Sequence, residues 1–146
     1  MPTNSWTRRS YEADVLLVPL DPAARTSAAA LIDQLPGITV ADGASLADER
    51  KHLERADVIT LLVRDLAAVD HDTVIRLGHA ARDTGTLLGA VVVTPCLAWS
   101  GADEDAGAAV VREYADTVVI VRDMPPVLHL LQVLRGGSRD AAEVTA

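Results

Sequence analysis

The stretch that decides the fold is ADVITLLVRDLAAVDHDTVIRLGHA, residues 56–80. It opens with a continuous apolar run that ends at Val63 and continues, after an acidic junction, into a helical pattern. A continuous apolar run, unlike an alternating one, is typical of a parallel strand that is covered on both faces. Alternating α/β proteins often hold a phosphate where such a strand meets its helix, and they use glycines there. This junction has no glycine and carries Asp65, Asp70 and Asp72, so we expect a nucleotide-binding fold that has lost its ligand.

Four further runs rich in Val, Leu and Ile occur at residues 13–20, 37–40, 87–94 and 115–121. Helical patterns alternate with these runs. The predicted helices cover residues 25–35, 46–55, 72–83, 104–114 and 125–135. The strict alternation with short connections predicts a three-layer, Rossmann-like α/β fold, in which helices flank a mostly parallel sheet of about five strands.

The length and composition predict one domain. A chain of 146 residues can build one sizeable core but not two. We expect a single α/β domain over residues 13–137, with a polar leader at 1–12 and a polar tail at 138–146. Hydrophobic residues make up 49% of the chain, yet aromatic residues make up 3% and Phe is absent. The core must therefore be built from Ala, Val, Leu and Ile.

The charge and the cysteine content exclude several kinds of partner. The formal net charge of −8 disfavours nucleic acid and anionic membrane surfaces. No run approaches the roughly 20 apolar residues that a membrane helix needs. Cys96 is the single cysteine, so no internal disulfide can form, which fits a cytoplasmic protein. Arg8 and Arg9 resemble a twin-arginine export signal, but acidic residues interrupt the run that follows.

The last predicted helix is the most functional-looking element. Pro125 and Pro126 fit a helix start, and Gly136 and Gly137 fit a stop. Six apolar residues cover nearly its whole circumference: Val127, Leu128, Leu130, Leu131, Val133 and Leu134. Such a helix needs cover on two sides, and the polar tail offers none. We therefore predict a homo-oligomer or protein-partner interface through the helix 125–135, formed by Val127, Leu128, Leu130, Leu131 and Leu134.

Several motifs occur in a fixed succession along the second half of the chain. They are ADVITLLV at 56–63, Gly85, GAVVVTP at 89–95, REYADTVVIVRD at 112–123 and VLRGG at 133–137. Over about residues 56–137 this succession resembles the nucleotide-binding domain of the tubulin/FtsZ family of polymerising GTPases. The resemblance implies a Rossmann-like fold whose last helix corresponds to the end of the long central helix of the family.

The chemistry of that family is missing from this chain. Its phosphate signature, GGGTGTG, would fall on residues 66–72, which read LAAVDHD. Glycines let backbone N–H groups approach phosphate oxygens without an intervening Cβ, and Asp70 and Asp72 would repel the anion. The turn after the first strand contains Pro22, which has no N–H to donate. The resemblance thus implies a domain without GTP hydrolysis or a bound cofactor, acting as an interaction or scaffold protein.

A second hypothesis places a small enzyme or ligand-binding site at the carboxyl ends of the strands. Asp21, Asp65, His71, Cys96 and Trp99 would line it. In that site His71 could act as the base for a Cys96 nucleophile, although a small buried thiol is the simpler reading. The acidic residues around His71 could also hold a divalent metal. We favour the alternative that Asp70 or Asp72 caps the following helix, and we expect no metal.

Overall fold

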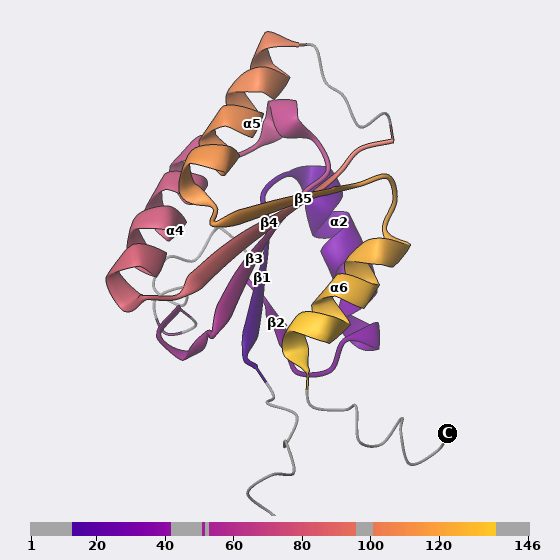
Figure 1. Ribbon diagram of the computed structural model, residues 1–146. Coiled ribbons are helices and arrows are strands. Elements are labelled where there is room, and N and C mark those ends of the chain that lie inside the picture. Colours follow the sequence, from indigo (N-terminus) through magenta and orange to yellow (C-terminus); the bar gives the residue numbers. More distant parts are fainter. Residues whose placement is uncertain (1–12, 42–50, 52, 96–100, 137–146) are drawn as a thin grey trace, which may run out of the picture.

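The chain forms an α/β domain with an all-parallel sheet (Figure 1). The computed structural model describes residues 13–41, 51, 53–95 and 101–136. The five strands are β1 (Val15–Pro19), β2 (Ile38–Val40), β3 (Val58–Val63), β4 (Leu87–Val93) and β5 (Thr117–Val121). They pair in the order β2-β1-β3-β4-β5. The Rossmann-like α/β architecture predicted from the alternating apolar runs is confirmed.

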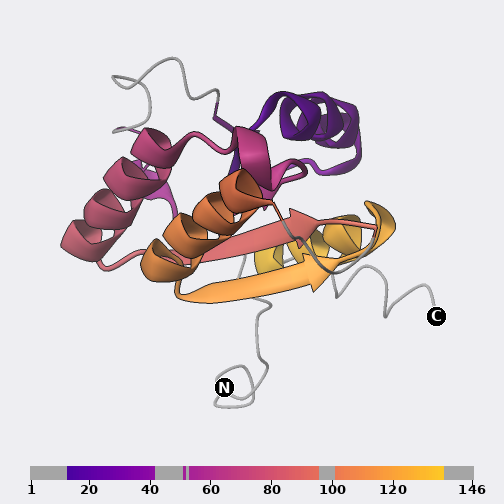
Figure 2. The ribbon, with the colours of Figure 1, turned by 90° about the horizontal axis from the view of Figure 1, so that it is seen from above.

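Helices cover both faces of the sheet. They are α2 (Pro22–Leu31), α4 (His71–Thr84), α5 (Ala102–Tyr114) and α6 (Pro125–Arg135), with short 3-10 turns η1 (Ile32–Gln34) and η2 (Leu66–Ala68). Figure 2 shows α4 and α5 on one side of the sheet and α2 and α6 on the other. Of the helix expected at residues 46–55, Lys51 and residues 53–55 are helical, and the rest lies outside the described residues.

The central strand β3 separates two hydrophobic cores. Ile59, Leu61 and Val63 point to the core beneath α4 and α5, whereas Leu62 points to the core beneath α2 and α6. Successive side chains of a strand alternate between the two faces of a sheet, and both faces are covered here. The continuous apolar run at 58–63 follows directly from this double burial.

The recurring Ala-Asp junctions close the amino ends of neighbouring strands. The Asp57 N–H donates to the Asp14 carbonyl at 2.8 Å, and the Asp57 carboxylate accepts the Asp14 N–H at 2.9 Å. Asp116 repeats this arrangement against Leu88, at 2.7 and 2.9 Å. Each aspartate thus adds a side-chain hydrogen bond to the first backbone contact of a parallel pair. This geometry gives the Ala-Asp junctions at 56–57 and 115–116 a structural role in the sheet.

Helix α6 is fixed at its carboxyl end. The Ala13 N–H donates to the Arg135 carbonyl at 2.7 Å, and the Arg135 guanidinium donates to the Pro36 carbonyl. Gly136 ends the helix with φ +65°, a conformation that L side chains rarely adopt. The predicted bounds of this helix are confirmed, and its last turn lies beside the start of β1.

Candidate functional site

The crevice where a doubly wound sheet binds its ligands lies between β1 and β3. The chain crosses from β1 to β2 on one side and from β3 to β4 on the other, so the connections diverge at this point. Ligands of open α/β sheets bind beyond the carboxyl ends of the strands at such a switch point. Asp21 follows β1, and Arg64 and Asp65 follow β3, so the residues that decide the chemistry of the crevice are these three.

The Asp21 carboxylate fills the anion position of the crevice from within. Its side chain has 0% exposed surface. One oxygen accepts the Ala24 N–H at 2.8 Å, and the other accepts the N–H groups of Arg64 at 2.8 Å and Asp65 at 3.2 Å. Backbone donors at the start of a helix are the groups that hold a phosphate in nucleotide-binding folds. Here an internal carboxylate uses them.

The side chains of Arg64 and Asp65 also make hydrogen bonds beside the crevice. The Arg64 guanidinium donates to the Ser27 hydroxyl of α2 at 2.8 Å, which links the end of β3 to the helix after β1. Asp65 is exposed, and its carboxylate accepts the Ala67 N–H at 3.2 Å. Asp65 therefore caps η2.

The loop at 66–72 packs into the core at the place where phosphate-binding α/β folds have a glycine-rich loop. Leu66 and Val69 are both buried in the core beneath α4 and α5. Gly107 of α5 lies against the loop so closely that a Cβ at this position would be 2.1 Å from the Leu66 carbonyl oxygen. Apolar side chains and a tightly packed helix therefore occupy the space that glycines leave open in a phosphate loop.

Asp70 caps α4, as the capping hypothesis predicted. Its carboxylate accepts the Thr73 N–H at 3.3 Å and the Thr73 hydroxyl at 2.8 Å. The hydroxyl bond is the main reason that the pKa of Asp70 lies below its usual value of 3.8. His71 is the exposed first residue of the helix. Within the described ranges no three acidic, histidine or cysteine side chains are grouped to hold a metal ion.

The predicted ligand-site residues do not form one site in the part of the chain that the structure describes. Asp21 is completely buried and contacts backbone groups instead of an open pocket. Asp65 and His71 are exposed at the start of separate helical segments. Cys96 and Trp99 lie outside the described residues, so the predicted nucleophile and its neighbour stay predictions.

Two open cavities lie at the opposite, amino-terminal edge of the sheet. One has a volume of about 250 Å³ and borders Asp14, Gly37 and Arg55. The other, of about 430 Å³, borders Arg82, Leu87 and Tyr114. In the second, the Arg82 guanidinium lies 5.5 Å from the centre of the Tyr114 ring. Sequence reasoning missed both cavities, because only the fold brings the residues that line each of them together.

Helix α6 buries more of its apolar surface inside the chain than the sequence predicted. Val127 and Leu131 have 0% exposed surface and belong to the core beneath α2 and α6. Leu128, Leu130 and Leu134 are partly buried against the same core. Val127 and Leu131 are therefore covered within the chain itself, and their role in an interface stays a prediction. Val133, which the predicted interface omitted, is 69% exposed.

On the α2 and α6 side of the sheet, part of β4 and β5 is left exposed by the helices. We define the open sheet face as Leu87, Gly89, Thr117 and Val119. These residues alternate in register with buried neighbours and point to the α2 and α6 side of the sheet. Leu87 is 45% exposed and Val119 is 39% exposed. Parallel sheets are normally covered on both faces, so this face is unusual. Ile120, on the other face of β5, is 37% exposed.

Comparisons with known proteins give no family assignment. No family model matches the chain, and no curated protein matches it. Among solved structures, the chain is similar to an aminotransferase from Neisseria meningitidis Z2491, with 13% identity and a TM-score of 0.39. The match covers 86% of this chain and 35% of that one. A resemblance at this level carries no inference about activity. Separately, none of the described helices is long and apolar enough to span a membrane.

Proposed function

We propose that this chain is a non-catalytic domain of the tubulin/FtsZ type that acts as an interaction or scaffold protein. The observation that carries the proposal is the buried Asp21 carboxylate, which accepts three backbone N–H groups in the switch-point crevice. A domain that still bound a nucleotide phosphate would need these donors for its ligand. The chain supplies its own anion instead.

Electrostatics also disfavours a phosphate in this crevice. Asp21, Asp65 and Asp70 all lie at the carboxyl edge of β1 and β3 or on the loop after it. At an effective dielectric near 20, two like charges about 4 Å apart repel by about 4 kcal/mol. One such contact would cancel much of the free energy of a micromolar complex, which is about 8 kcal/mol. This supports a domain without GTPase activity or a nucleotide cofactor.

The open side of the sheet supports the interaction role. The open sheet face, together with Ile120 and Val133, exposes apolar side chains around β5 and α6. Exposed apolar patches that adjoin an unpaired sheet edge mark protein contacts. With a net charge of −8, a protein surface fits better than nucleic acid or an anionic membrane. We also propose a cytoplasmic location, which the single cysteine, Cys96, supports.

The test is a titration with fluorescent GTP and ATP analogues in the presence of Mg²⁺. We expect no saturable binding at concentrations up to about 1 mM. The Arg64→Ala variant is the matched control, because it removes an exposed guanidinium beside the crevice that could attract nucleotide weakly. Saturable binding by the wild type, with a Kd below about 10 μM, would contradict the proposal. The ligand-binding hypothesis for the strand ends would then take its place.

A further inference from the structure

We infer that the partner is a second copy of this chain, which pairs antiparallel with the outer edge of β5 about a two-fold axis at Val119. This inference rests on the proposed interaction role and names its partner. It joins two five-stranded sheets into one continuous sheet.

The backbone of β5 presents an unpaired edge. The Thr94 N–H donates to the Val121 carbonyl at 2.8 Å, so this carbonyl faces β4. The N–H and C=O groups of successive residues point to opposite edges of a strand. The backbone groups of Val119 therefore also point to β4, and those of Val118 and Ile120 point away from the sheet. Within the described residues no strand pairs with this edge. Only another strand can satisfy a row of outward N–H and C=O groups in a regular way.

The sequence of β5 lacks the features that prevent edge pairing. Natural edge strands are protected by charged residues, proline or bulges. The five residues of β5 read TVVIV, with neither charge nor proline. The strand is β-branched throughout, and such side chains stabilise cross-strand pairs. An edge of this kind is expected to be covered by a strand of similar composition, and a second β5 has that composition.

A two-fold axis at Val119 gives a register in which β-branched side chains lie opposite one another along the whole of β5. Val118 then lies opposite the partner's Ile120, and their outward backbone groups form a hydrogen-bonded pair. Thr117 lies opposite the partner's Val121. Val119 meets the partner's Val119 in a non-hydrogen-bonded pair, where side chains approach most closely. The pairing would cover Val119 and Ile120, which are 39% and 37% exposed in one copy.

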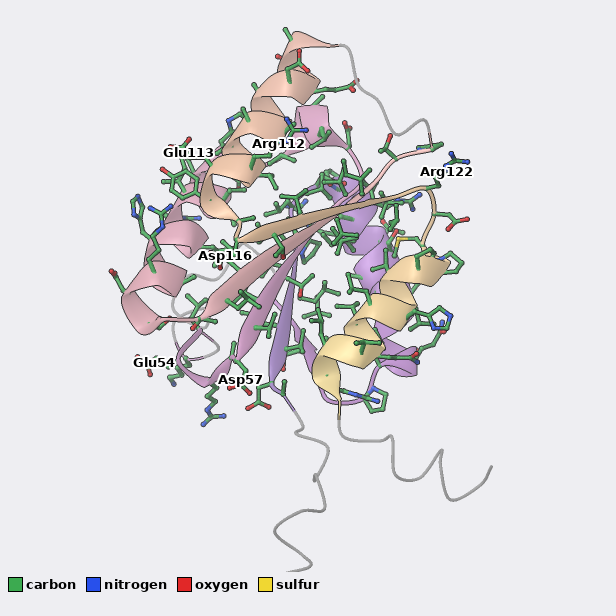
Figure 3. The ribbon with its side chains drawn as sticks, in the orientation of Figure 1. Glu54, Asp57, Arg112, Glu113, Asp116 and Arg122 are labelled. Atoms are coloured by element: carbon green, nitrogen blue, oxygen red, sulfur yellow. The ribbon has the colours of Figure 1, made fainter. Side chains whose placement is uncertain are left out.

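The charges at the two ends of β5 select this register. Figure 3 shows Asp116 and Arg122 at opposite ends of the strand, and both residues are exposed. The axis at Val119 places Asp116 opposite the partner's Arg122, twice in each dimer. One oxygen of the Asp116 carboxylate accepts the Leu88 N–H of β4 at 2.9 Å, and the charge of the group acts on the partner's guanidinium. Moving the axis to Val118 or Ile120 would set one of these charges opposite an apolar residue. A parallel, in-register pair would set like charges side by side, which is unfavourable.

Symmetry favours the same arrangement. A two-fold axis perpendicular to the sheet gives a closed, isologous dimer, the commonest form of homo-oligomer. It also keeps the two open sheet faces on the same side, so that they meet at Val119.

The experiment is disulfide cross-linking of a Val119→Cys variant in a Cys96→Ser background, followed by sedimentation of the wild-type chain. In a non-hydrogen-bonded pair the two Cα atoms lie about 4.5 Å apart, which is within the range that a disulfide spans. We expect Val119→Cys to form a covalent dimer on mild oxidation. The matched control is Val133→Cys in the same background, which places an exposed thiol on α6 and should stay monomeric under these conditions.

A charge variant tests the register independently of cysteine chemistry. Arg122→Glu would place Glu opposite the partner's Asp116 at both ends of the pair, and we expect the dimer Kd to rise about tenfold or more. Arg122→Lys keeps the charge and should leave the Kd within about threefold of the wild type. An unchanged Kd for Arg122→Glu would overturn the proposed register.

The possible outcomes separate this inference from the proposed function. Cross-linking at position 133 but not at 119, in a chain that sediments as a dimer, would overturn β5 pairing and leave association through α6 in place. A chain that stays monomeric up to about 500 μM, with no cross-link at either position, would overturn self-association altogether. Cross-linking at 119 alone, with the effect of Arg122→Glu, is the result we expect.

Discussion

The two ends of this sheet differ in how completely the chain satisfies its own polar and apolar groups. At the β1–β3 crevice, Asp21 accepts three backbone N–H groups, and Leu66 and Val69 fill the loop above the core. At the β5 edge, backbone groups face outward and the open sheet face is partly bare. The crevice, where this fold usually binds its ligands, is complete without a ligand. The edge, which most proteins protect, is incomplete.

This difference indicates which part of the molecule gains the most free energy from binding a partner. An unpaired polar group or a large exposed apolar side chain costs free energy that a binding partner can recover. A ligand would gain little free energy in the crevice, because the backbone N–H groups there already donate to the Asp21 carboxylate. The β5 edge offers both backbone hydrogen bonds and apolar area, and this favours a protein partner over a small ligand.

We expect the largest loss of stability from removing the Asp21 carboxylate at the β1–β3 crevice. Asp21→Ala would leave the N–H groups of Ala24, Arg64 and Asp65 without their acceptor. We expect the free energy of unfolding to fall by about 3 to 5 kcal/mol, because several charge-assisted bonds are lost together. Urea denaturation measures the change. The control is Asp65→Ala, which removes one exposed cap and should cost about 1 kcal/mol; equal losses for both variants would contradict the account.

Gly107→Ala tests how tightly α5 closes the loop after β3. The new Cβ would lie 2.1 Å from the Leu66 carbonyl oxygen, and this backbone atom cannot move aside cheaply. We expect a loss of about 2 to 3 kcal/mol in thermal or chemical unfolding. Gly101→Ala is the matched substitution, since its Cβ would meet only the Glu104 side chain, at 3.6 Å and beyond. A Gly107→Ala variant as stable as Gly101→Ala would show that the loop is not packed as described.

The Asp70 cap is expected to contribute a smaller, pH-dependent term. Asp70→Ala should lower the free energy of unfolding by about 1 kcal/mol near pH 7. The Thr73 hydroxyl holds the pKa of Asp70 below 3.8 in the folded chain, so the contribution is fully present above the unfolded pKa. It is lost as the pH falls from that value through the lower folded pKa. Unfolding curves of the wild type and of Asp70→Ala, recorded between about pH 2 and pH 7, measure this difference in the free energy of unfolding. A difference in the free energy of unfolding that grows toward low pH would contradict this prediction.

Thr60→Val changes a residue that pairs with Gly89 of the open sheet face, and we expect it to have the smallest effect on stability. Thr60 lies in β3 beside Gly89, and its hydroxyl is buried with no hydrogen-bond partner among the described residues. Valine keeps the shape and removes the unsatisfied group, so we expect a gain of about 0.5 to 1 kcal/mol. Calorimetry measures it, and Thr73→Val, which removes a bonded hydroxyl, should have the opposite sign. A clear loss for Thr60→Val would mean that the hydroxyl has a partner.

Much of the fold could be predicted from the sequence because double burial has a simple signature. The continuous apolar runs gave all five strands, and Pro125 and Gly136 gave the bounds of α6. The acidic loop also gave a correct prediction, since Asp70 does cap α4. These features are local: each depends on residues that lie within a few positions of one another.

The details of the site were not predictable because they depend on distant residues. Asp21 reads as a helix cap, and only the fold shows that Arg64 and Asp65 share its carboxylate. The apolar circumference of α6 predicted exposed surface on that helix, whereas most of its apolar residues pack against the core of the chain. Val127 and Leu131 are buried within the chain, whereas Val119 and Leu87, which the predicted interface did not include, are exposed.

Residue-resolved amide hydrogen exchange tests the contrast between the two ends most directly. The wild-type chain is measured by NMR at low and high protein concentration, with and without Mg²⁺-GTP. The account predicts that the amides of Arg64 and Asp65 are protected throughout and insensitive to nucleotide. It also predicts that the amides of Val118 and Ile120 exchange freely when dilute and become protected when concentrated. The opposite result, protection of the crevice by nucleotide and a β5 edge that stays open at every concentration, would contradict it.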